Sequence, residues 1–226
     1  TLAAGVAHEI NNPLTAILGF AQGLKRRNSK LKDAIDEELY ADFTEYTETI
    51  IKECLRCRDI VQTLLTFSRP TAASLGQVEL NQCVTDTLFI LKHHFKEHRD
   101  LSVLTELQDN LPSILGDESQ LKQVIINLLS NAIDATGGNG AIHIRTATAA
   151  GGRVELVIED SGCGIPHELQ HRLFEPFFTT KPVGKGVGIG LSTCYAIVKS
   201  HNGEISVTSA AGQGSAFRVA LPGVHA

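Results

Sequence analysis

The spacing of apolar residues divides the chain into a helical first part and a mixed remainder. In the first part, apolar residues recur every three or four positions, which is the repeat of one face of an α-helix. One stripe consists of Leu2, Val6, Ile10, Leu14 and Ile17, and a second of Ile50, Cys54, Cys57, Val61 and Leu64. This pattern predicts two long helices that form a hairpin around residues 28–36.

A hairpin with one apolar stripe on each helix does not close a hydrophobic core by itself. A second copy of the chain is the complement we expect, giving a homodimer with a four-helix bundle. Cys54 and Cys57 form a CxxC pair, which can hold zinc or carry redox chemistry when a partner pair exists, and the sequence contains no second pair. Because both cysteines fall on the stripe, we interpret them as packing residues.

Strand-like and helical stretches alternate in the remainder of the chain. Strands are predicted at residues 78–80, around 102–107, and at 141–148, 153–160, 204–209 and 215–221. Helices are predicted from an Asn81 N-cap toward Phe95, from Gly116-Asp117-Glu118 through Ala135, and from about Gly190 to His201. The second of these is closed by the glycine-rich stretch 137–140, which begins at Gly137. The Gly151-Gly152 pair predicts a hairpin between two of the strands.

These elements predict an α+β fold class: a helical hairpin followed by an α/β sandwich with its helices on one face of a mixed sheet. Pro70 and the small residues after it are typical of a linker. We therefore expect one domain at residues 1–69, a linker at 70–76 and a second domain at 77–226.

Composition narrows the class of protein. The chain has 226 residues, 42% of them hydrophobic, which is enough to bury a core, and its net charge of -5 argues against nucleic acid as a partner. Five cysteines without a disulfide-dense pattern fit a reducing compartment, and no apolar run reaches about 18 residues. We expect a cytoplasmic fragment without a membrane segment of its own, either free or the cytoplasmic part of a membrane-anchored protein. The lack of Met, even at position 1, indicates that an upstream part has been removed.

The first candidate site lies on the first helix, in the sequence His8-Glu9-Ile10-Asn11-Asn12-Pro13. Helical spacing puts His8 opposite the apolar stripe, with Asn12 one turn further along the same face. The Glu9 carboxylate can accept the Nδ1 proton of the imidazole, which leaves Nε2 free to attack. Pro13 removes the hydrogen bond to the Glu9 carbonyl and predicts a bend there. The simpler alternatives are a surface histidine and an ordinary kink.

The second candidate site combines a pair of amides with a carboxylate. Asn127 and Asn131 are four residues apart and share one helical face, from which amide oxygens can coordinate Mg²⁺ together with phosphate oxygens. Asp160 ends a predicted strand, where a buried carboxylate can accept a hydrogen bond from an exocyclic amine such as that of adenine. Asparagine pairs on helices more often face solvent, so this hypothesis depends on its companions.

Those companions are two glycine clusters, at residues 160–166 and 184–191, and an aromatic segment, 173–181, between them. Neither cluster is a P-loop or a GxGxxG motif, and each by itself is equally a turn-rich loop. The second cluster opens a predicted helix, whose N-terminal amides and dipole favour phosphate. The aromatic segment resembles a hinged lid over a nucleotide, although Phe177 and Phe178 are also candidates for the core.

Taken together, the ordered motifs resemble the catalytic core of the sensor histidine kinases of two-component systems. They are His-Glu-x-x-Asn-Pro at residues 8–13, NLLSNAIDA at 127–135, DSGCGI at 160–165, FEPFFTTK at 174–181 and GVGIGL at 186–191. The resemblance covers nearly the whole chain. It implies a dimerisation and phosphoacceptor hairpin, followed by a Bergerat-type ATP-binding domain shared with gyrase-like and chaperone ATPases.

The resemblance also implies residue roles. His8 would be the phosphorylated residue, Glu9 its acid/base partner, Asn131 the Mg²⁺ ligand and Asp160 the residue that reads adenine. The implied nucleotide-binding residues are Asn127, Asn131, Asp160, Gly162, Gly164, Ile165, Thr180, Lys181, Gly186, Gly188, Gly190 and Leu191. The implied cofactors are ATP and Mg²⁺, and the implied partners are a second copy of the chain and the receiver domain of a response regulator.

Two positions bear on the activity. Hydrolysing relatives of the fold place a water-activating glutamate where this chain has Asn127, so the site should wait for another nucleophile, and His8 is the candidate. Asn12 fits a Glu-x-x-Asn pattern implicated in orienting a water that dephosphorylates the regulator, unless it only solvates the bend. The competing hypotheses are an ATP-hydrolysing clamp of the gyrase or chaperone type and a scaffold that binds a regulator without turnover.

Overall fold

The structure is a computed structural model that describes residues 2–28, 31–32, 35–68, 75–97, 100–181 and 188–224. The chain forms two compact units, Thr1–Pro70 and Thr71–Ala226. Residues 69–74, which include most of the predicted linker at 70–76, lie outside the described residues, so the linker's bounds stay a prediction.

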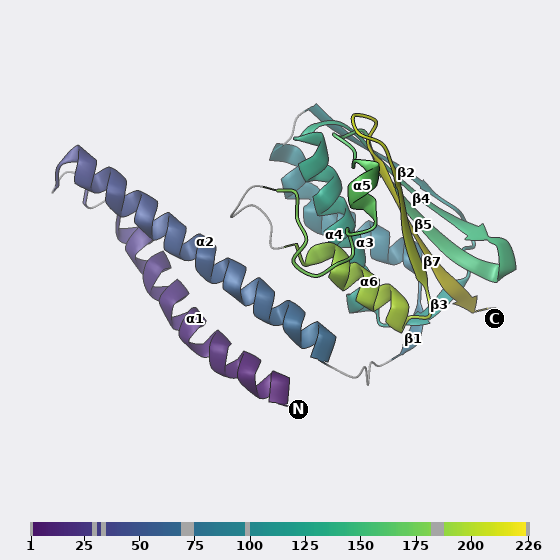
Figure 1. Cartoon of the computed structure of the whole chain (residues 1–226), viewed down its shortest axis with the longest axis horizontal. Helices are drawn as coiled ribbons and strands as arrows, with labels where there is room; N and C mark the ends of the chain where they lie inside the picture. The colour runs from purple at the N-terminus through teal and green to yellow at the C-terminus, as the bar shows by residue number, and fades with distance from the viewer. Residues whose placement is uncertain are drawn as a thin grey trace. The chain divides into compact units, whose positions relative to one another are not determined.

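The first unit is a pair of packed helices, α1 (Leu2–Arg27) and α2 (Glu37–Ser68), as Figure 1 shows. The side chain of Asn28, buried where α1 ends, donates a hydrogen bond of 2.7 Å to Thr44 Oγ1 on α2. The helix α1 runs through Pro13 as one element. None of the described helices is long and apolar enough to cross a membrane.

The two predicted apolar stripes are only partly buried within one chain. Cys54 is buried, whereas Cys57 is exposed. Large apolar side chains remain exposed on both helices: Ile10, Ile17, Phe20 and Leu24 on α1, and Leu39, Tyr46 and Ile50 on α2. The hairpin alone therefore leaves apolar surface in water, which is the cost that a second copy would remove.

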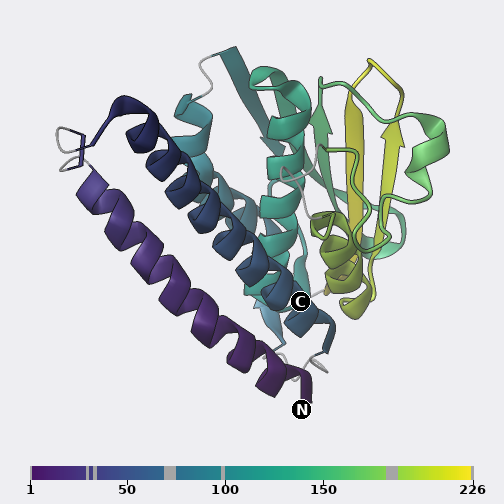
Figure 2. The ribbon, with the colours of Figure 1, turned by 60° about the vertical axis from the view of Figure 1, so that its left-hand side comes forward.

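The second unit is a sheet covered on one face by helices (Figures 1 and 2). Its strands are β1 (Gly76–Val78), β2 (Asp100–Leu107), β3 (Ser113–Gly116), β4 (Asn139–Ala149), β5 (Arg153–Asp160), β6 (Glu204–Ser209) and β7 (Ser215–Val224). Its helices are α3 (Leu80–Glu97), α4 (Glu118–Thr136), the short α5 (His167–Gln170) and α6 (Gly190–Ser200), with a 3₁₀ turn at Ala150–Gly152.

The sheet is mixed. The strand order is β1-β3-β7-β5-β4-β2, with β6 also paired to β7; β2 and β4 run parallel, and the other pairs are antiparallel. Alternate residues of the central strands face the helices, so Ile142 and Ile144 of β4 and Leu156 and Ile158 of β5 are buried. The helix α4 supplies the opposing layer of apolar side chains at a spacing of three to four residues. The predicted fold class is confirmed.

Local predictions succeed where a single residue decides the geometry. Asp117 caps α4 by accepting a hydrogen bond of 3.1 Å from the Gln120 amide, and Gly137 ends the helix with a φ of 62°. The predicted strands differ from the structure in two places. The first strand lies at Gly76–Val78 rather than 78–80, and the short strand β3 was not predicted.

Asn81 does not cap the helix that follows, because α3 already begins at Leu80. Its side chain instead donates a hydrogen bond of 2.9 Å to the Gln108 carbonyl and accepts one of 2.7 Å from Thr146 Oγ1. Asn81 therefore ties α3 to the ends of strands β2 and β4, a long-range role that the local sequence does not reveal.

Candidate functional site

The first part of the site is the outward face of α4. Asn127 and Asn131 are half-buried, and Asp134, one turn beyond Asn131, is exposed. The side-chain amide of Asn127 donates a hydrogen bond of 3.3 Å to the carbonyl oxygen of Gly190. This bond joins the middle of α4 to the first residue of α6, so that the two helices share one edge of the site.

The side chain of Lys181 places a positive charge on this face. The ammonium of Lys181 is 2.5 Å from Asp134 Oδ2 and 3.4 Å from Asn131 Oδ1. An amide oxygen and a carboxylate oxygen thus converge on one positive charge, and oxygen is the donor that Mg²⁺ prefers. The residues present therefore fit a divalent cation.

This cation site would be incomplete without a ligand. Among the described residues, no three His, Cys, Asp or Glu side chains cluster in a way that could hold a metal ion. Any Mg²⁺ bound beside Asn131 would need several oxygens from water and phosphate, as is usual for this ion at nucleotide sites.

The second part of the site is Asp160, at the end of β5. Residues 156, 158 and 160 share the inward face of the strand, and Asp160 is accordingly only 5% exposed. Burial raises the pKa of its carboxyl group, while hydrogen bonds from the backbone amides of Gly162 and Ser215 oppose that rise. The amide of Gly162 is 2.8 Å from Oδ1. A buried carboxylate of this kind can accept a hydrogen bond from an amine that comes within reach of its oxygens.

The glycines after Asp160 are required by the protein's own packing. A Cβ at Gly162 would lie 2.5 Å from the carbonyl of Ala135 at the end of α4. Gly164 has a φ of 65°, and a Cβ there would clash with the carbonyl oxygen of Ala210. The Ile165 amide then donates a hydrogen bond of 2.8 Å to Ser209 Oγ. The loop is thus held between α4 and the turn that joins β6 to β7.

The third part is the N-terminus of α6. The amides of a first helical turn have no partner within the helix, and Ile189 before α6 makes no side-chain cap. Such a terminus favours phosphate. Gly188, with a φ of 71°, lies so close to the backbone of Phe177 and Phe178 that a Cβ would come within 2.5 Å of both. Leu191 packs against the core, and Gly186 lies outside the described residues.

The aromatic segment is not simply core. Phe177 is 60% exposed and has a φ of 67°, a conformation that L-residues seldom adopt. The guanidinium of Arg172 lies over the ring of Phe178, 4.5 Å from its centroid. Thr180 is exposed, and Lys181 extends from the end of this segment to α4. The predicted lid movement remains a prediction.

The first-helix residues are placed by their backbone only. His8 and Glu9 belong to α1, and their side chains lie outside the described part of the chain. Asn12, which follows them by one turn, is exposed, as its helical position predicts.

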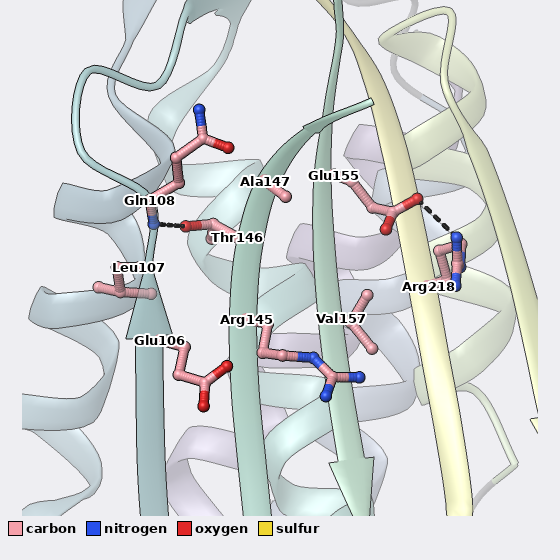
Figure 3. Close-up of a pocket in the computed structure, with 9 residues that line it drawn as sticks. All are labelled: Glu106, Leu107, Gln108, Arg145, Thr146, Ala147, Glu155, Val157 and Arg218. Carbon is pink, nitrogen blue, oxygen red and sulfur yellow. Dashed lines mark hydrogen bonds and ion pairs between the residues drawn. The ribbon is translucent and has the colours of Figure 1, made fainter. Parts of the chain in front are cut away.

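A hollow elsewhere on the sheet is unrelated to these residues. Figure 3 shows it on the face of the sheet away from the helices, with a volume of about 420 Å³. It is lined by Glu106, Leu107, Gln108, Arg145, Thr146, Ala147, Glu155, Val157 and Arg218. Arg218 is already paired with Glu155 at 2.9 Å, and no residue predicted for the site reaches the hollow.

Asp134 is the site residue that the sequence analysis missed. It follows Asn127 by seven residues and Asn131 by three, which places all three on one helical face. That spacing was visible in the sequence, but Asp134 was not singled out, because its partner Lys181 is 47 residues away along the chain.

Comparisons with known proteins agree with this arrangement of parts. Residues 1–73 match the His Kinase A (phospho-acceptor) domain, and residues 116–225 match the family of histidine kinase-, DNA gyrase B- and HSP90-like ATPases. The chain therefore carries an ATP-binding domain of that family.

Individual relatives extend over the whole chain. The signal transduction histidine-protein kinase AtoS of Escherichia coli is 40% identical over 221 residues, covering 98% of this chain and 34% of AtoS. Sporulation kinase C of Bacillus subtilis is 35% identical, with 98% and 48% covered. The chain thus spans less than half the length of either kinase.

Solved structures show the same fold. Full-length ShkA in complex with AMPPNP aligns with a TM-score of 0.77 at 26% identity, over 100% of this chain and 46% of ShkA. The histidine kinase ThkA, in complex with the response regulator protein TrrA, aligns with a TM-score of 0.69 at 30% identity, over 99% of this chain and 61% of ThkA. The catalytic domain of ThkA alone is 31% identical, with a TM-score of 0.60, and this chain covers 99% of it. The chain belongs to the sensor histidine kinase family, of which it carries the phosphoacceptor and ATP-binding domains.

Proposed function

We propose that this protein is an ATP-dependent protein-histidine kinase that phosphorylates His8 and passes the phosphoryl group to an aspartate of a response regulator. The observation that carries the proposal is the environment of Asn127. Its amide nitrogen is committed to the Gly190 carbonyl, 3.3 Å away, and an amide does not accept a proton from water. A phosphoryl group held beside it therefore awaits a nucleophile from elsewhere, and His8 lies in the phosphoacceptor domain.

The nucleotide is held by three parts of the second unit. Asp160 accepts a hydrogen bond from the exocyclic amine of adenine, and the loop through Gly162, Gly164 and Ile165 shapes the base pocket. The phosphates lie at the N-terminus of α6, against the amides of Gly188 and Gly190, with Thr180 alongside. Gly186, which lies outside the described residues, stays a phosphate-binding residue that the resemblance implies. The match to an ATPase family and the AMPPNP bound to ShkA support this assignment.

Asn131 would hold Mg²⁺, which would neutralise charge on the phosphate oxygens. The protein's own groups orient the reactants. Glu9 accepts the Nδ1 proton of His8, and Nε2 attacks the γ-phosphorus in line with the departing ADP. A P–N bond forms as the P–O bond to ADP breaks. A carboxylate of the receiver domain then takes the phosphoryl group from the imidazole.

A homodimer supplies the phosphoacceptor bundle. The exposed apolar side chains of α1 and α2, including Ile10, Phe20 and Ile50, give two hairpins a surface to bury between them. All five cysteines are free, in keeping with a reducing, cytoplasmic location. The ThkA complex with TrrA supports a receiver domain as the second partner. Asn12, exposed one turn from His8, is the residue for a second, phosphatase activity toward that partner.

Incubation of the purified chain with γ-labelled ATP and Mg²⁺ tests the proposal. We expect an acid-labile, base-stable label on the protein that is absent in His8→Gln and retained in His171→Gln, an exposed histidine of the second unit. Label that persists in His8→Gln contradicts the acceptor. Multiple-turnover release of phosphate without labelled protein would instead favour the ATP-hydrolysing clamp, and failure to bind nucleotide would favour a scaffold.

For the phosphatase activity, a phosphorylated receiver domain is incubated with the chain and ADP. Asn12→Ala should slow the loss of phosphate from the receiver while it leaves labelling of His8 in place. Equal loss with the unchanged chain and Asn12→Ala would contradict the role of Asn12.

A further inference from the structure

One exposed ion pair in the second unit involves the predicted metal ligand itself. Lys181 Nζ contacts Asp134 Oδ2 at 2.5 Å and Asn131 Oδ1 at 3.4 Å, so two oxygens of α4 share one ammonium. The exposed pair of Arg172 with Glu175, by contrast, joins neighbours on one segment. The Lys181 pair instead joins the end of the aromatic segment to the middle of α4.

We propose that Asn131 and Asp134 form a site for a single cation, which the Lys181 ammonium fills when no nucleotide is bound and the nucleotide-bound divalent cation fills afterwards. The inference rests on the nucleotide site proposed above. It adds Asp134 as a positioning residue for the metal and Lys181 as the cation that the metal replaces.

Charge explains why the two cations exclude one another. Asn131 is neutral and Asp134 carries one negative charge, which the ammonium already balances. A divalent ion beside Asn131 Oδ1 would lie within a few ångström of Lys181 Nζ, and like charges at that separation repel strongly in a partly desolvated site. Lys181 therefore leaves as the metal arrives, and Asp134 becomes available to the metal or to one of its water ligands.

The strength of the present pair suits this exchange. The side chains of Lys181 and Asp134 are 34% and 55% exposed, so water screens the pair and each partner can find solvent when they separate. A fully buried pair would hold too tightly to exchange. The freed ammonium remains close to the bound phosphates, which offer it new oxygen partners.

The exchange is tested by nucleotide binding rather than by phosphorylation. A methylanthraniloyl-AMPPNP probe reports binding to the whole chain, first in EDTA and then during a Mg²⁺ titration. The variants are Asp134→Asn, Lys181→Met and the double variant. Asp109→Asn and Lys92→Met, at exposed positions of the second unit, remove the same charges elsewhere. Circular dichroism melts confirm that each variant is folded.

The two single variants should shift the metal requirement in opposite directions. Asp134→Asn should raise the half-saturating Mg²⁺ concentration about tenfold, as loss of a group that supports a metal ligand commonly does, without weakening binding in EDTA. Lys181→Met should lower that concentration about two- to five-fold, the factor that a half-exposed ion pair is worth. In the double variant the loss of Lys181 should have no further effect, because its competition requires Asp134.

Three results would overturn the inference. The first is a Mg²⁺ requirement that neither variant changes beyond the controls, and the second is a requirement that Lys181→Met raises, which would make Lys181 a phosphate ligand only. The third is the absence of probe binding to the unchanged chain, which would also overturn the proposed nucleotide site. If Asp134→Asn and Lys181→Met shift the Mg²⁺ requirement in opposite directions as expected, but the unchanged chain shows no labelling of His8, only the proposed kinase activity is contradicted.

Discussion

Gly164 offers a sharp test of how the Asp160 loop is built. A Gly164→Ala variant places a methyl group on a residue with a φ of 65°, where an L-residue costs about 1–2 kcal/mol. The same methyl group would overlap the carbonyl oxygen of Ala210, which belongs to the turn between β6 and β7. Relief of that overlap requires the loop and the turn to separate.

Separation breaks at least one hydrogen bond, from the Gly212 amide to the Cys163 carbonyl at 2.7 Å. A hydrogen bond of this kind contributes about 1 kcal/mol. The total cost is therefore about 2–3 kcal/mol, and for a unit of roughly 150 residues each kcal/mol lowers the melting temperature by about 2–4 °C. We expect Gly164→Ala to melt about 4–12 °C below the unchanged chain.

Gly137→Ala is the matched control. Gly137 has nearly the same φ, 62°, but no atom lies within 4 Å of an added Cβ, so only the backbone cost of about 1–2 kcal/mol applies. In scanning calorimetry of the whole chain, the transition of the second unit is the one with the larger unfolding enthalpy, because that unit has more residues. If the two alanine variants melt within 1 °C of each other, the close packing of Gly164 does not stabilise the unit and the reasoning is wrong.

Three further predictions concern titratable groups. Burial raises the pKa of Asp160, so ionisation of its carboxyl group lowers the stability of the fold as pH rises from the ordinary range of an aspartate through the raised pKa. Asp160→Asn should remove that loss of stability, which urea denaturation of both proteins across pH 4–7 measures. Parallel plots of stability against pH for the two proteins would contradict this prediction. The same variant should bind AMPPNP at least about tenfold more weakly, because a charge-assisted hydrogen bond is worth about 1.5–3 kcal/mol. Burial raises the pKa of Cys194 to about 12, whereas Cys163 is exposed. Iodoacetamide at pH 8 should therefore alkylate Cys163 and spare Cys194 in the folded chain, as measured by mass spectrometry.

The sequence predicted those elements in which one residue or one repeat decides the conformation. The period of two in β4 and β5 places Asp160 on the buried face without knowledge of the fold. The carboxylate of Asp117 and the absent side chain of Gly137 likewise define the two ends of α4 by local chemistry. In each case the information lies within about four residues of the position concerned.

Features that depend on distant partners were not predicted. Asparagine is a residue type that commonly caps helices, but Asn81 is hydrogen-bonded to Gln108 and Thr146, which are 27 and 65 residues away. The strand β3 has four residues, too few to display alternation, and pairing with β1 and β7 defines it instead. Asp134 belongs to the same class, because only the tertiary structure brings Lys181 to it.

The glycines after Asp160 also have contacts with distant residues that the sequence did not reveal. The resemblance in sequence implies that Gly162 and Gly164 bind the nucleotide. In the structure, Gly162 and Gly164 approach the backbone of α4 and of the turn after β6. The two interpretations are compatible, since a loop pressed against its neighbours is a rigid wall for whatever binds beside Asp160.

The candidate site thus has one side that is held rigidly and one side, at Lys181, where contacts can open. On one side, backbone contacts hold the Asp160 loop, and the Asn127 amide joins α4 to α6 at 3.3 Å, so neither can move without loss of buried packing. On the other side, Lys181 is anchored to α4 by contacts that water reaches, and such half-exposed pairs open at little cost. In the proposed exchange, a nucleotide that brings its own cation would disturb only the second side. The metal, rather than the base, would then be the part of the ligand that releases the aromatic segment from α4.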